Sequence, residues 1–257
     1  MASSAPRIHP TAVIHPEAKL PDDIAIGPYA VVGAGVTLGR RTRILAHVVV
    51  EGPTEIGEDN VLCPFAAIGG SAQDKRHQDG RGKLVIGSHN VFREHVTVHR
   101  GTGGRSTVIG DHGLFMVASH LAHDVAVGSS VTLANGVQLA GHAVVEDHVT
   151  FGGMSGLAQF VRVGESAFVA AGAMCERDVP PFVVVQGDRA RVRALNKVGL
   201  RRRGIDEPSI VRLEKAFRAL FFGTRPRAQV LVEIDASDPL VARLLAALSP
   251  TEGRPSR

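Results

Sequence analysis

A pair of histidines followed by a carboxylate stands in the segment HLAHDV, residues 120–125. His120 and His123 are three residues apart, and Asp124 follows directly. Histidine, whose ordinary pKa lies near 6.5, suits general-base chemistry at neutral pH, and a neighbouring carboxylate can orient and polarise it. Histidines are also frequent ligands of zinc-like ions. The arrangement of the elements that hold these residues therefore determines whether they form a general base or a metal site.

The composition limits the class of protein. The 257 residues include 29 glycines, one tyrosine and no tryptophan, which indicates many tight corners around small aliphatic layers. The N-terminus has no apolar stretch long enough for a signal peptide, and no run approaches the roughly 18 apolar residues of a membrane span. We therefore expect a cytoplasmic protein without a membrane span, in which Cys63 and Cys175 are free thiols.

The positive charge is concentrated in residues 176–203, which hold eight arginines and lysines against three acidic residues. Such a local excess favours an anionic partner. No aromatic residue alternates with the arginines from 189 to 203, so the pattern for stacking on nucleic-acid bases is missing and no nucleic acid is expected.

An aliphatic residue recurs at every sixth position. The first run has eleven consecutive members from Ile8 to Ile68, and the second has twelve from Ile109 to Cys175, all but the last plainly hydrophobic. A period of six belongs neither to a helix nor to a simple strand. It indicates short strands joined by corners, so that three six-residue units make one coil and the coils stack as a parallel β-helix.

Two excursions interrupt the repeat, near residues 70–85 and 100–108, and loops held by a rigid scaffold are where functional residues concentrate. After Cys175 the repeat stops. Asp206-Glu207-Pro208 then predicts a helix start with a stop at Gly223, and Asp238-Pro239 predicts a second helix through Leu248. We therefore expect a β-helix over residues 1–187 and a helical C-terminal domain over residues 188–257.

In such a prism, residues three repeats apart stack about 5 Å from one another. His123 then lies beneath Gly141, Gly141 beneath Gln159, and Asp124 beneath His142, which makes one patch on neighbouring coils. His123 can act as a general base oriented by Asp124, and the backbone N–H of Gly141 can stabilise an oxyanion.

Seven short motifs follow one another along nearly the whole chain: AQD at 72–74, REHVTVHRGT at 93–102, HLAHD at 120–124, LAGH at 139–142, QF at 159–160, DVPPFVVVQGD at 178–188 and GLRRRG at 199–204. With the six-residue repeat, they make the chain resemble the UDP-N-acetylglucosamine O-acyltransferases of lipid A biosynthesis. The resemblance implies a mostly β fold, a left-handed parallel β-helix prism followed by a small α-helical C-terminal domain. The handedness comes from the resemblance, because the period does not specify it.

The implied reaction moves a (3-hydroxy)acyl chain from acyl carrier protein to the 3-position of UDP-N-acetylglucosamine or a close amino-sugar analogue. This is the first step of lipid A biosynthesis. The resemblance implies a homotrimer with the site between subunits, and neither a bound cofactor nor a metal, because the donor carries its phosphopantetheine on acyl carrier protein. A basic segment at 176–203 suits that acidic partner.

The resemblance assigns the same catalytic roles to His123 and Gly141, beside Asp124 as the orienting carboxylate inferred above, and it implies that Ala171 limits the acyl-chain length. The implied substrate-binding residues are Asp74, Arg76, His120, His142, Gln159, Asn196, Arg202 and Arg203. Three positions depart from the family pattern: Ala158 replaces a common histidine, Val198 a common acidic residue, and Arg76 a lysine.

Two other interpretations stay open. One is a metal-dependent hydratase of the β-helical carbonic anhydrase type, in which the ligands would come from His95, His99, His120, His123 and His142. It leaves the arginine-rich segment and the AQD loop without a role. The other is a non-catalytic paralogue, with which Ala158 and Val198 are compatible.

Overall fold

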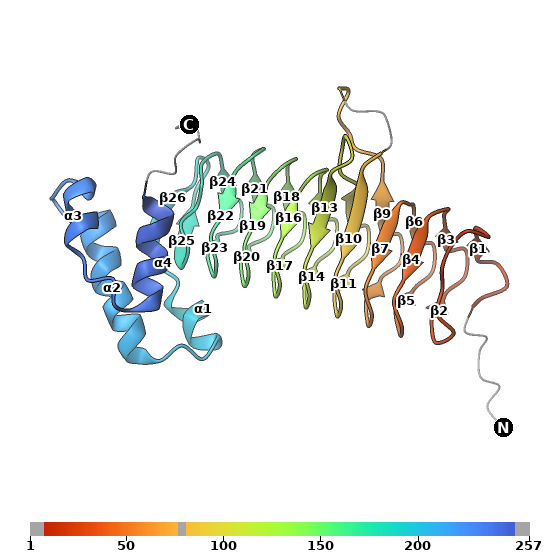
Figure 1. The fold of residues 1–257 in the computed structure, drawn as a ribbon, viewed down its shortest axis with the longest axis horizontal. Helices are drawn as coiled ribbons and strands as arrows, with labels where there is room; N and C mark the ends of the chain where they lie inside the picture. The colour runs from red at the N-terminus through yellow and green to blue at the C-terminus, as the bar shows by residue number, and fades with distance from the viewer. Residues whose placement is uncertain (1–7, 77–80, 250–257) are drawn as a thin grey trace.

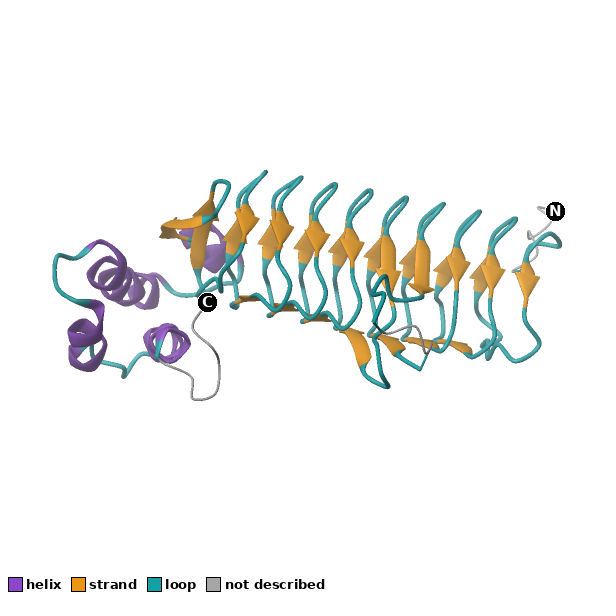
Figure 2. Ribbon diagram, turned by 90° about the horizontal axis from the view of Figure 1, so that it is seen from above, coloured by secondary structure: helices purple, strands orange, loops and turns teal. Residues whose placement is uncertain are grey.

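The protein is a prism of short parallel strands with a cluster of helices at its C-terminal end (Figure 1). The structure is a computed structural model that describes residues 8–76 and 81–249. Within these residues the strands form three sheets, one for each side of the coil (Figure 2). The chain passes from the ten-stranded sheet to the nine-stranded sheet, then to the seven-stranded sheet, and back. The predicted parallel β-helix is therefore confirmed.

The three sheets divide the strands as follows. The nine-stranded sheet contains β1 (Val13–Ile14), β3 (Val31–Val32), β6 (Val49–Val50), β9 (Ala67–Gly70), β12 (Thr97–His99), β15 (His120–Leu121), β18 (Gln138–Leu139), β21 (Gly156–Leu157) and β24 (Met174–Cys175). The seven-stranded sheet contains β4 (Val36–Leu38), β7 (Thr54–Ile56), β10 (Lys83–Ile86), β13 (Ser106–Ile109), β16 (Ala126–Val127), β19 (Val144–Val145) and β22 (Arg162–Val163). The ten-stranded sheet contains β2 (Ala25–Ile26), β5 (Arg43–Ile44), β8 (Val61–Leu62), β11 (Val91–Phe92), β14 (Leu114–Phe115), β17 (Thr132–Leu133), β20 (Thr150–Phe151), β23 (Phe168–Val169), β25 (Val183–Gln186) and β26 (Arg191–Leu195).

Each six-residue unit in the middle of the prism buries two side chains rather than one. The repeat residue, such as Leu121 or Leu139, is fully buried, and so is the residue two positions earlier, such as Ser119 or Val137. Both reach the interior because residues i and i+2 of an extended strand point to the same side. The second set includes serine, threonine and asparagine, which is why only the first set gives a clear period in the sequence.

The register of the strands shows how the two loops fit into the stack. Where the repeat is uninterrupted, each residue pairs with the one three repeats further on, as His120 does with Gln138. Across the loop between β9 and β10, Thr54 pairs with Leu84, which is twelve positions further along than the regular step. Across the loop between β12 and β13, Lys83 pairs with Ser106, which is five positions further along. The first loop thus adds a whole number of repeats and keeps the phase, whereas the second shifts it.

The corners of the coils are built from residues in the left-handed backbone conformation. At the corner between the ten-stranded and nine-stranded sheets, Tyr29, His47, Phe65 and His95 all have positive φ angles. Their rings stack in succession with centroids 5.2, 5.0 and 5.2 Å apart. The corners therefore align side chains from successive coils in columns, and the candidate site lies in one such column.

Past the last coil, β25 pairs in parallel with β23 and antiparallel with β26, so a hairpin extends the ten-stranded sheet. No pattern in the sequence predicted this hairpin. The expected domain division after residue 187 falls at the turn between β25 and β26. Residues 1–7, 77–80 and 250–257, which belong to the expected domains, lie outside the described residues.

The helices are α1 (Lys197–Arg202), α2 (Glu207–Phe222), α3 (Arg227–Glu233) and α4 (Pro239–Leu248). Asp206 caps α2 by accepting from the Ser209 amide, and Asp238 caps α4 by accepting from the Leu240 amide. These N-caps satisfy amides that have no partner within the helix. The predicted helices beginning at 206 and 238 are confirmed, while α1 and α3 were not predicted. No helix of the described chain is long and apolar enough to cross a membrane.

Candidate active site

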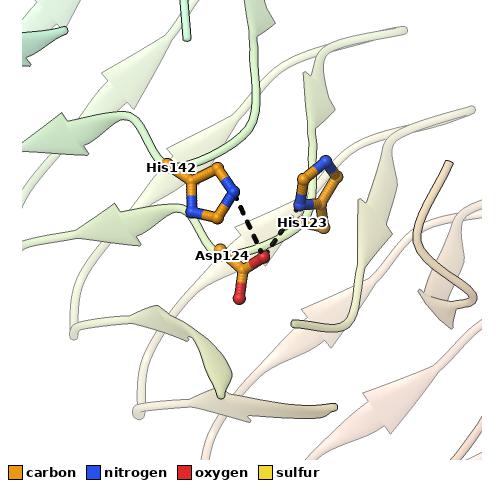
Figure 3. A group of neighbouring side chains, drawn as sticks. All are labelled: His123, Asp124 and His142. Carbon is orange, nitrogen blue, oxygen red and sulfur yellow. Dashed lines mark hydrogen bonds and ion pairs between the residues drawn. The ribbon is translucent and has the colours of Figure 1, made fainter. Parts of the chain in front are cut away.

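His123 and Asp124 lie at the corner where the chain leaves β15 for β16. Asp124 and His142, one coil apart, have φ angles of 60° and 61°, in the left-handed region that Asp and His tolerate better than most residues. The His142 amide donates to the His123 carbonyl at 3.1 Å. His142 Nε2 lies 3.7 Å from Asp124 Oδ2 (Figure 3). The stacking of Asp124 and His142 expected from the coil length is therefore present.

The buried carboxylate of Asp124 fixes the imidazole of His123. Its Oδ2 is 2.8 Å from His123 Nδ1 (Figure 3), and the Asp124 side chain is 3% exposed. Since a carboxylate can only accept, Nδ1 is the atom that carries the proton. His123 is itself buried, and no described residue forms a hydrogen bond with its Nε2. The lone pair on Nε2 is thus available to accept a proton from a substrate.

Two residues from the loop between β12 and β13, Thr102 and Arg105, also contact Asp124, although neither was predicted as a site residue from the sequence. The Thr102 amide donates to Oδ1 at 3.0 Å and the Thr102 hydroxyl to Oδ2 at 2.6 Å. Arg105 Nε is 3.3 Å from Oδ1. Burial by itself would raise the pKa of Asp124, but the hydrogen bonds from Thr102 and His123 outweigh burial and hold this pKa below its usual range. The signal available in the sequence was the excursion itself, since Thr102 ends the REHVTVHRGT motif.

Gly141 allows the ring of His123 to pack directly against the next coil. A Cβ at this position would lie 2.7 Å from Cε1 and 2.8 Å from Nε2 of His123, closer than real contacts allow. The Gly141 carbonyl accepts from the Phe160 amide at 3.2 Å, whereas no described backbone carbonyl accepts from the Gly141 amide. That amide is available to a ligand beside Nε2.

Further histidines surround this pair. His120 Nδ1 is 2.7 Å from the Thr97 hydroxyl, and the His99 ring meets His120 edge-on with centroids 4.9 Å apart. His142 stacks on Phe160 with centroids 4.6 Å apart. The predicted sugar-site residues His120 and His142 therefore both lie near His123, and His99 lies beside His120.

Desolvation keeps these flanking histidines neutral. Burial, with smaller contributions from His120 and His123, lowers the pKa of His99 to about 4. Burial and the proximity of His123 also lower the pKa of His120. For His142, burial outweighs the opposing effect of Asp124, so its pKa is lowered too. At neutral pH these rings are hydrogen-bonding groups rather than cations.

A groove with a volume of about 490 Å³ runs from His123 over the face of the nine-stranded sheet. It crosses four successive coils, a length of about 14 Å at the usual strand spacing. Its lining residues are Gln73, His120, Ala122, His123, Gln138, Leu139, Ala140, Gly141, Gly156, Leu157, Ala158, Gln159, Met174, Cys175 and Glu176. Alanine, glycine and leucine dominate the part beyond His123, so the groove suits a slender apolar chain.

Two further predicted binding residues, Gln159 and Asp74, lie near the same corner. Gln159 lines the groove. Asp74 has a side chain that is 9% exposed and an electrostatic effect on His142 that raises the pKa of that histidine, which places Asp74 near the same corner. Arg76 is largely exposed, and its Nη2 is 3.0 Å from Asp74 Oδ2. Arg76 thus pairs with Asp74 itself.

The structure does not bring Asn196 and Arg203 to the groove of their own chain. Asn196 caps α1 and donates from Nδ2 to the Ser166 carbonyl at 2.8 Å. Arg203 pairs with Glu165 at 2.6 Å and also donates to the Ser166 hydroxyl. Residues 165–166 form a corner between the seven-stranded and ten-stranded sheets, which is a different corner from that of His123. Arg202 is exposed beside them.

Ala171 lies at the third corner, between β23 and β24. It is exposed and is not among the residues that line the groove of its own chain. The expected stack on Gly153 and Asn135 is present, because the Gly172 amide donates to the Gly153 carbonyl and the Met154 amide to the Asn135 carbonyl, both at 2.9 Å. Whether Ala171 limits the acyl chain stays a prediction.

The ligand atoms of His123, Asp124 and His142 lie within 4.8 Å of one another, as a metal site would require. Asp124 Oδ2, the oxygen nearest both histidines, already accepts from His123 Nδ1 and from the Thr102 hydroxyl. His95, a ligand expected for a hydratase, stacks on Phe65 at another corner. The donor set thus fits a hydrogen-bonded histidine–carboxylate pair better than a metal centre.

A hexapeptide-repeat prism with a histidine–carboxylate pair at the mouth of an apolar groove defines an acyltransferase of the β-helical class. Within that class the chain belongs to the UDP-N-acetylglucosamine O-acyltransferase family. The family model for the second domain of UDP-N-acetylglucosamine O-acyltransferase matches residues 178–255.

Relatives cover almost the whole chain. The acyl-[acyl-carrier-protein]–UDP-N-acetylglucosamine O-acyltransferase of Stenotrophomonas maltophilia is 44% identical over 91% of this chain and 90% of its own. That of Thermodesulfovibrio yellowstonii is 42% identical over 89% and 88%. Among solved structures, LpxA from Acinetobacter baumannii has a TM-score of 0.89 at 37% identity, over 95% of this chain and 96% of its own. The expected left-handed β-helix with a small helical C-terminal part is confirmed.

Proposed function

We propose that this protein transfers an acyl chain from acyl carrier protein to the 3-position of UDP-N-acetylglucosamine, the first step of lipid A biosynthesis. The observation that carries the proposal is the His123–Asp124 pair beside Gly141, at the mouth of the apolar groove. The names of relatives that are more than two-fifths identical over about nine-tenths of both chains support the same donor and acceptor.

In the proposed reaction, His123 Nε2 removes the proton from the sugar hydroxyl while the hydroxyl oxygen attacks the thioester carbonyl. The resulting oxyanion accepts a hydrogen bond from the Gly141 amide. Collapse of this intermediate breaks the carbon–sulfur bond, and the departing thiolate takes the proton from His123 Nε2. Asp124 stabilises the imidazolium that exists between the two proton transfers. Its pKa, held below the usual range, keeps it a carboxylate throughout.

The surroundings divide between the two substrates. The apolar groove beyond Gly141 accepts the acyl chain, and Ala171 of a neighbouring prism packed against the groove limits the chain length. His120, His142 and Asp74 contact the acceptor sugar, since the lowered pKa values of the two histidines make them neutral hydrogen-bonding groups. An acceptor sugar that carries an amino group in place of the 3-hydroxyl would be acylated with the same geometry.

A homotrimer is proposed because the nucleotide-binding residues stand at a different corner from the base. Asn196, Arg202 and Arg203 lie beside the corner at 165–166, so a neighbouring prism packed against the groove can supply them. Each site would then take its base from one subunit and its nucleotide-binding residues from the neighbouring subunit. Acyl carrier protein would bind the basic segment 176–203, which includes those nucleotide-binding residues.

The test is acyl transfer to the UDP-sugar by purified protein, wild type against His123→Gln. Removing a general base typically costs on the order of 10² to 10⁴ in rate. His47→Gln is the matched control, because His47 also occupies a left-handed corner but stacks between Tyr29 and Phe65 in the N-terminal coils, away from both proposed parts of the site. Near-normal turnover by His123→Gln would remove His123 from the role of base.

A further inference from the structure

The loop between β12 and β13 is a compact, anchored turn over the candidate site. The Arg105 amide donates to the Thr102 carbonyl at 2.9 Å, and the two residues between them, Gly103 and Gly104, have φ angles of 55° and 82°. Two consecutive positive φ angles at the centre of a turn favour glycine. The base of the loop is fixed to Lys83, whose amide donates to Arg105 and whose carbonyl accepts from Gly101.

This turn places one hydrogen-bond donor of Thr102 on each oxygen of the Asp124 carboxylate. Thr102, which is 1% exposed, donates its amide to Asp124 Oδ1 and its hydroxyl to Oδ2. Arg105 contacts Oδ1 and donates from Nη2 to the Thr102 hydroxyl oxygen at 3.0 Å. The Thr102 hydroxyl proton is committed to Asp124, because its oxygen already accepts from the guanidinium.

Building on the proposed function, we propose that Thr102 is a positioning residue that holds Asp124 in the one orientation in which Oδ2 accepts from His123, with Arg105 reinforcing it. A carboxylate attached by a single bond can rotate, and rotation would release Nδ1–H and allow the other imidazole tautomer. The bonds from Thr102 to both oxygens prevent that rotation. The five inserted residues of this loop thus act through Asp124 to keep His123 Nε2 in its basic form.

A purely structural role for Thr102, as an anchor of the loop, predicts different behaviour. If Thr102 is only an anchor, replacing it would lower the free energy of unfolding without changing the tautomer of His123. If Thr102 is a positioning residue, replacing it would lower kcat and leave KM for the UDP-sugar nearly unchanged, because Thr102 reaches the substrate only through Asp124 and His123.

The experiment compares Thr102→Val with Thr102→Ser. Valine keeps the shape and removes the hydroxyl, and serine restores it. We expect Thr102→Val to lower kcat about 10- to 100-fold, the range typical of outer partners that orient a functional histidine, with KM changed less than about twofold. Thr102→Ser should recover most of the rate. Thr42→Val is the matched control, because Thr42 is buried and bonded to a backbone carbonyl far from the site; it should leave kcat unchanged.

A second readout needs no turnover. The hydrogen-bonded Nδ1 proton of His123 gives a downfield NMR signal, assigned by its loss in His123→Ala. Thr102→Val should broaden or shift this signal, and Thr42→Val should not. Arg105→Gln should cause a smaller loss of kcat that shrinks at high salt, because Arg105 is 57% exposed. An unchanged signal and unchanged kcat in Thr102→Val would overturn the proposal, whereas an inactive wild type with an altered signal in Thr102→Val would overturn the proposed function alone.

Discussion

At the scale of single residues, the site depends on how closely one imidazole lies against one glycine. Gly141→Ala would add a methyl group less than 3 Å from the His123 ring. We expect the ring to be displaced and kcat to fall on the order of 100-fold, as a misplacement of about 1 Å can cause. Gly33→Ala is the control, since Gly33 lies in the N-terminal coils and its new methyl group would come no closer than 3.3 Å to its nearest neighbour, the Val50 carbonyl oxygen. Steady-state kinetics on both variants, with the folded state checked by circular dichroism, gives the comparison; equal rates for the two would refute the close-packing argument.

At the same scale, the sequence predicted His123, Asp124, Gly141 and His142 together because all four follow the stacking of the coils. It missed Thr102 and Arg105, which reach Asp124 from a five-residue insertion with no periodic relation to the coils. It also missed that Asn196 serves as a helix cap, since a cap is defined by the helix that follows and α1 is too short to give a pattern.

At the scale of elements, β12 and β15 bury neighbouring histidines, which makes stability depend on pH. The pKa of His99 falls from about 6.5 in an unfolded chain to about 4 in the folded protein. Between these values the unfolded chain binds a proton that the folded protein does not, so stability falls as the pH falls from 6.5 towards 4 and is unaffected by this group above 6.5. The loss amounts to at most about 3 kcal/mol.

We therefore expect His99→Gln to lose less stability between pH 8 and pH 5 than the wild type does. Urea-unfolding midpoints at the two pH values measure the difference, and His47→Gln serves again as the control that should follow the wild type. If His99→Gln lost as much stability as the wild type, protonation of His99 would not be what destabilises the protein in acid.

The elements themselves were predictable to different degrees. The strands predicted from the repeat residues and the helices predicted from the caps at Asp206 and Asp238 are confirmed, because burial and capping leave a local pattern in the sequence. The β25–β26 hairpin has no such pattern, since its residues pair with each other across a turn at 187–190 while continuing a sheet built by distant coils. Helix α3 follows Pro226 without a side-chain cap.

At the scale of the whole molecule, the separation of His123, the proposed base, from Arg202 and Arg203, the proposed nucleotide-binding residues, predicts sites shared between subunits. Light scattering should give three copies of the 27.1-kDa chain. Co-assembly of His123→Gln subunits, which lack the base, with Arg202→Ala subunits, which bind the UDP-sugar weakly, should restore activity at low UDP-sugar concentration at about a quarter of the interfaces, where an intact His123 meets an intact Arg202. A monomer, or a mixture as inactive as its parts, would contradict the shared site.

The stacking of coils described above also makes the molecule nearly one-dimensional in its energetics, since each coil contacts mainly the coils before and after it. The two ends are not equivalent. Ile8 in the first described coil is 40% exposed, whereas Ile26, one coil on, is 2% exposed, and the other end is closed by a hairpin and helices. Local opening should therefore start at the N-terminal end and fade along the axis. The candidate site lies several coils beyond the N-terminal end, so such fraying reaches it late, and distance along the prism separates the chemistry from the loosest part of the molecule.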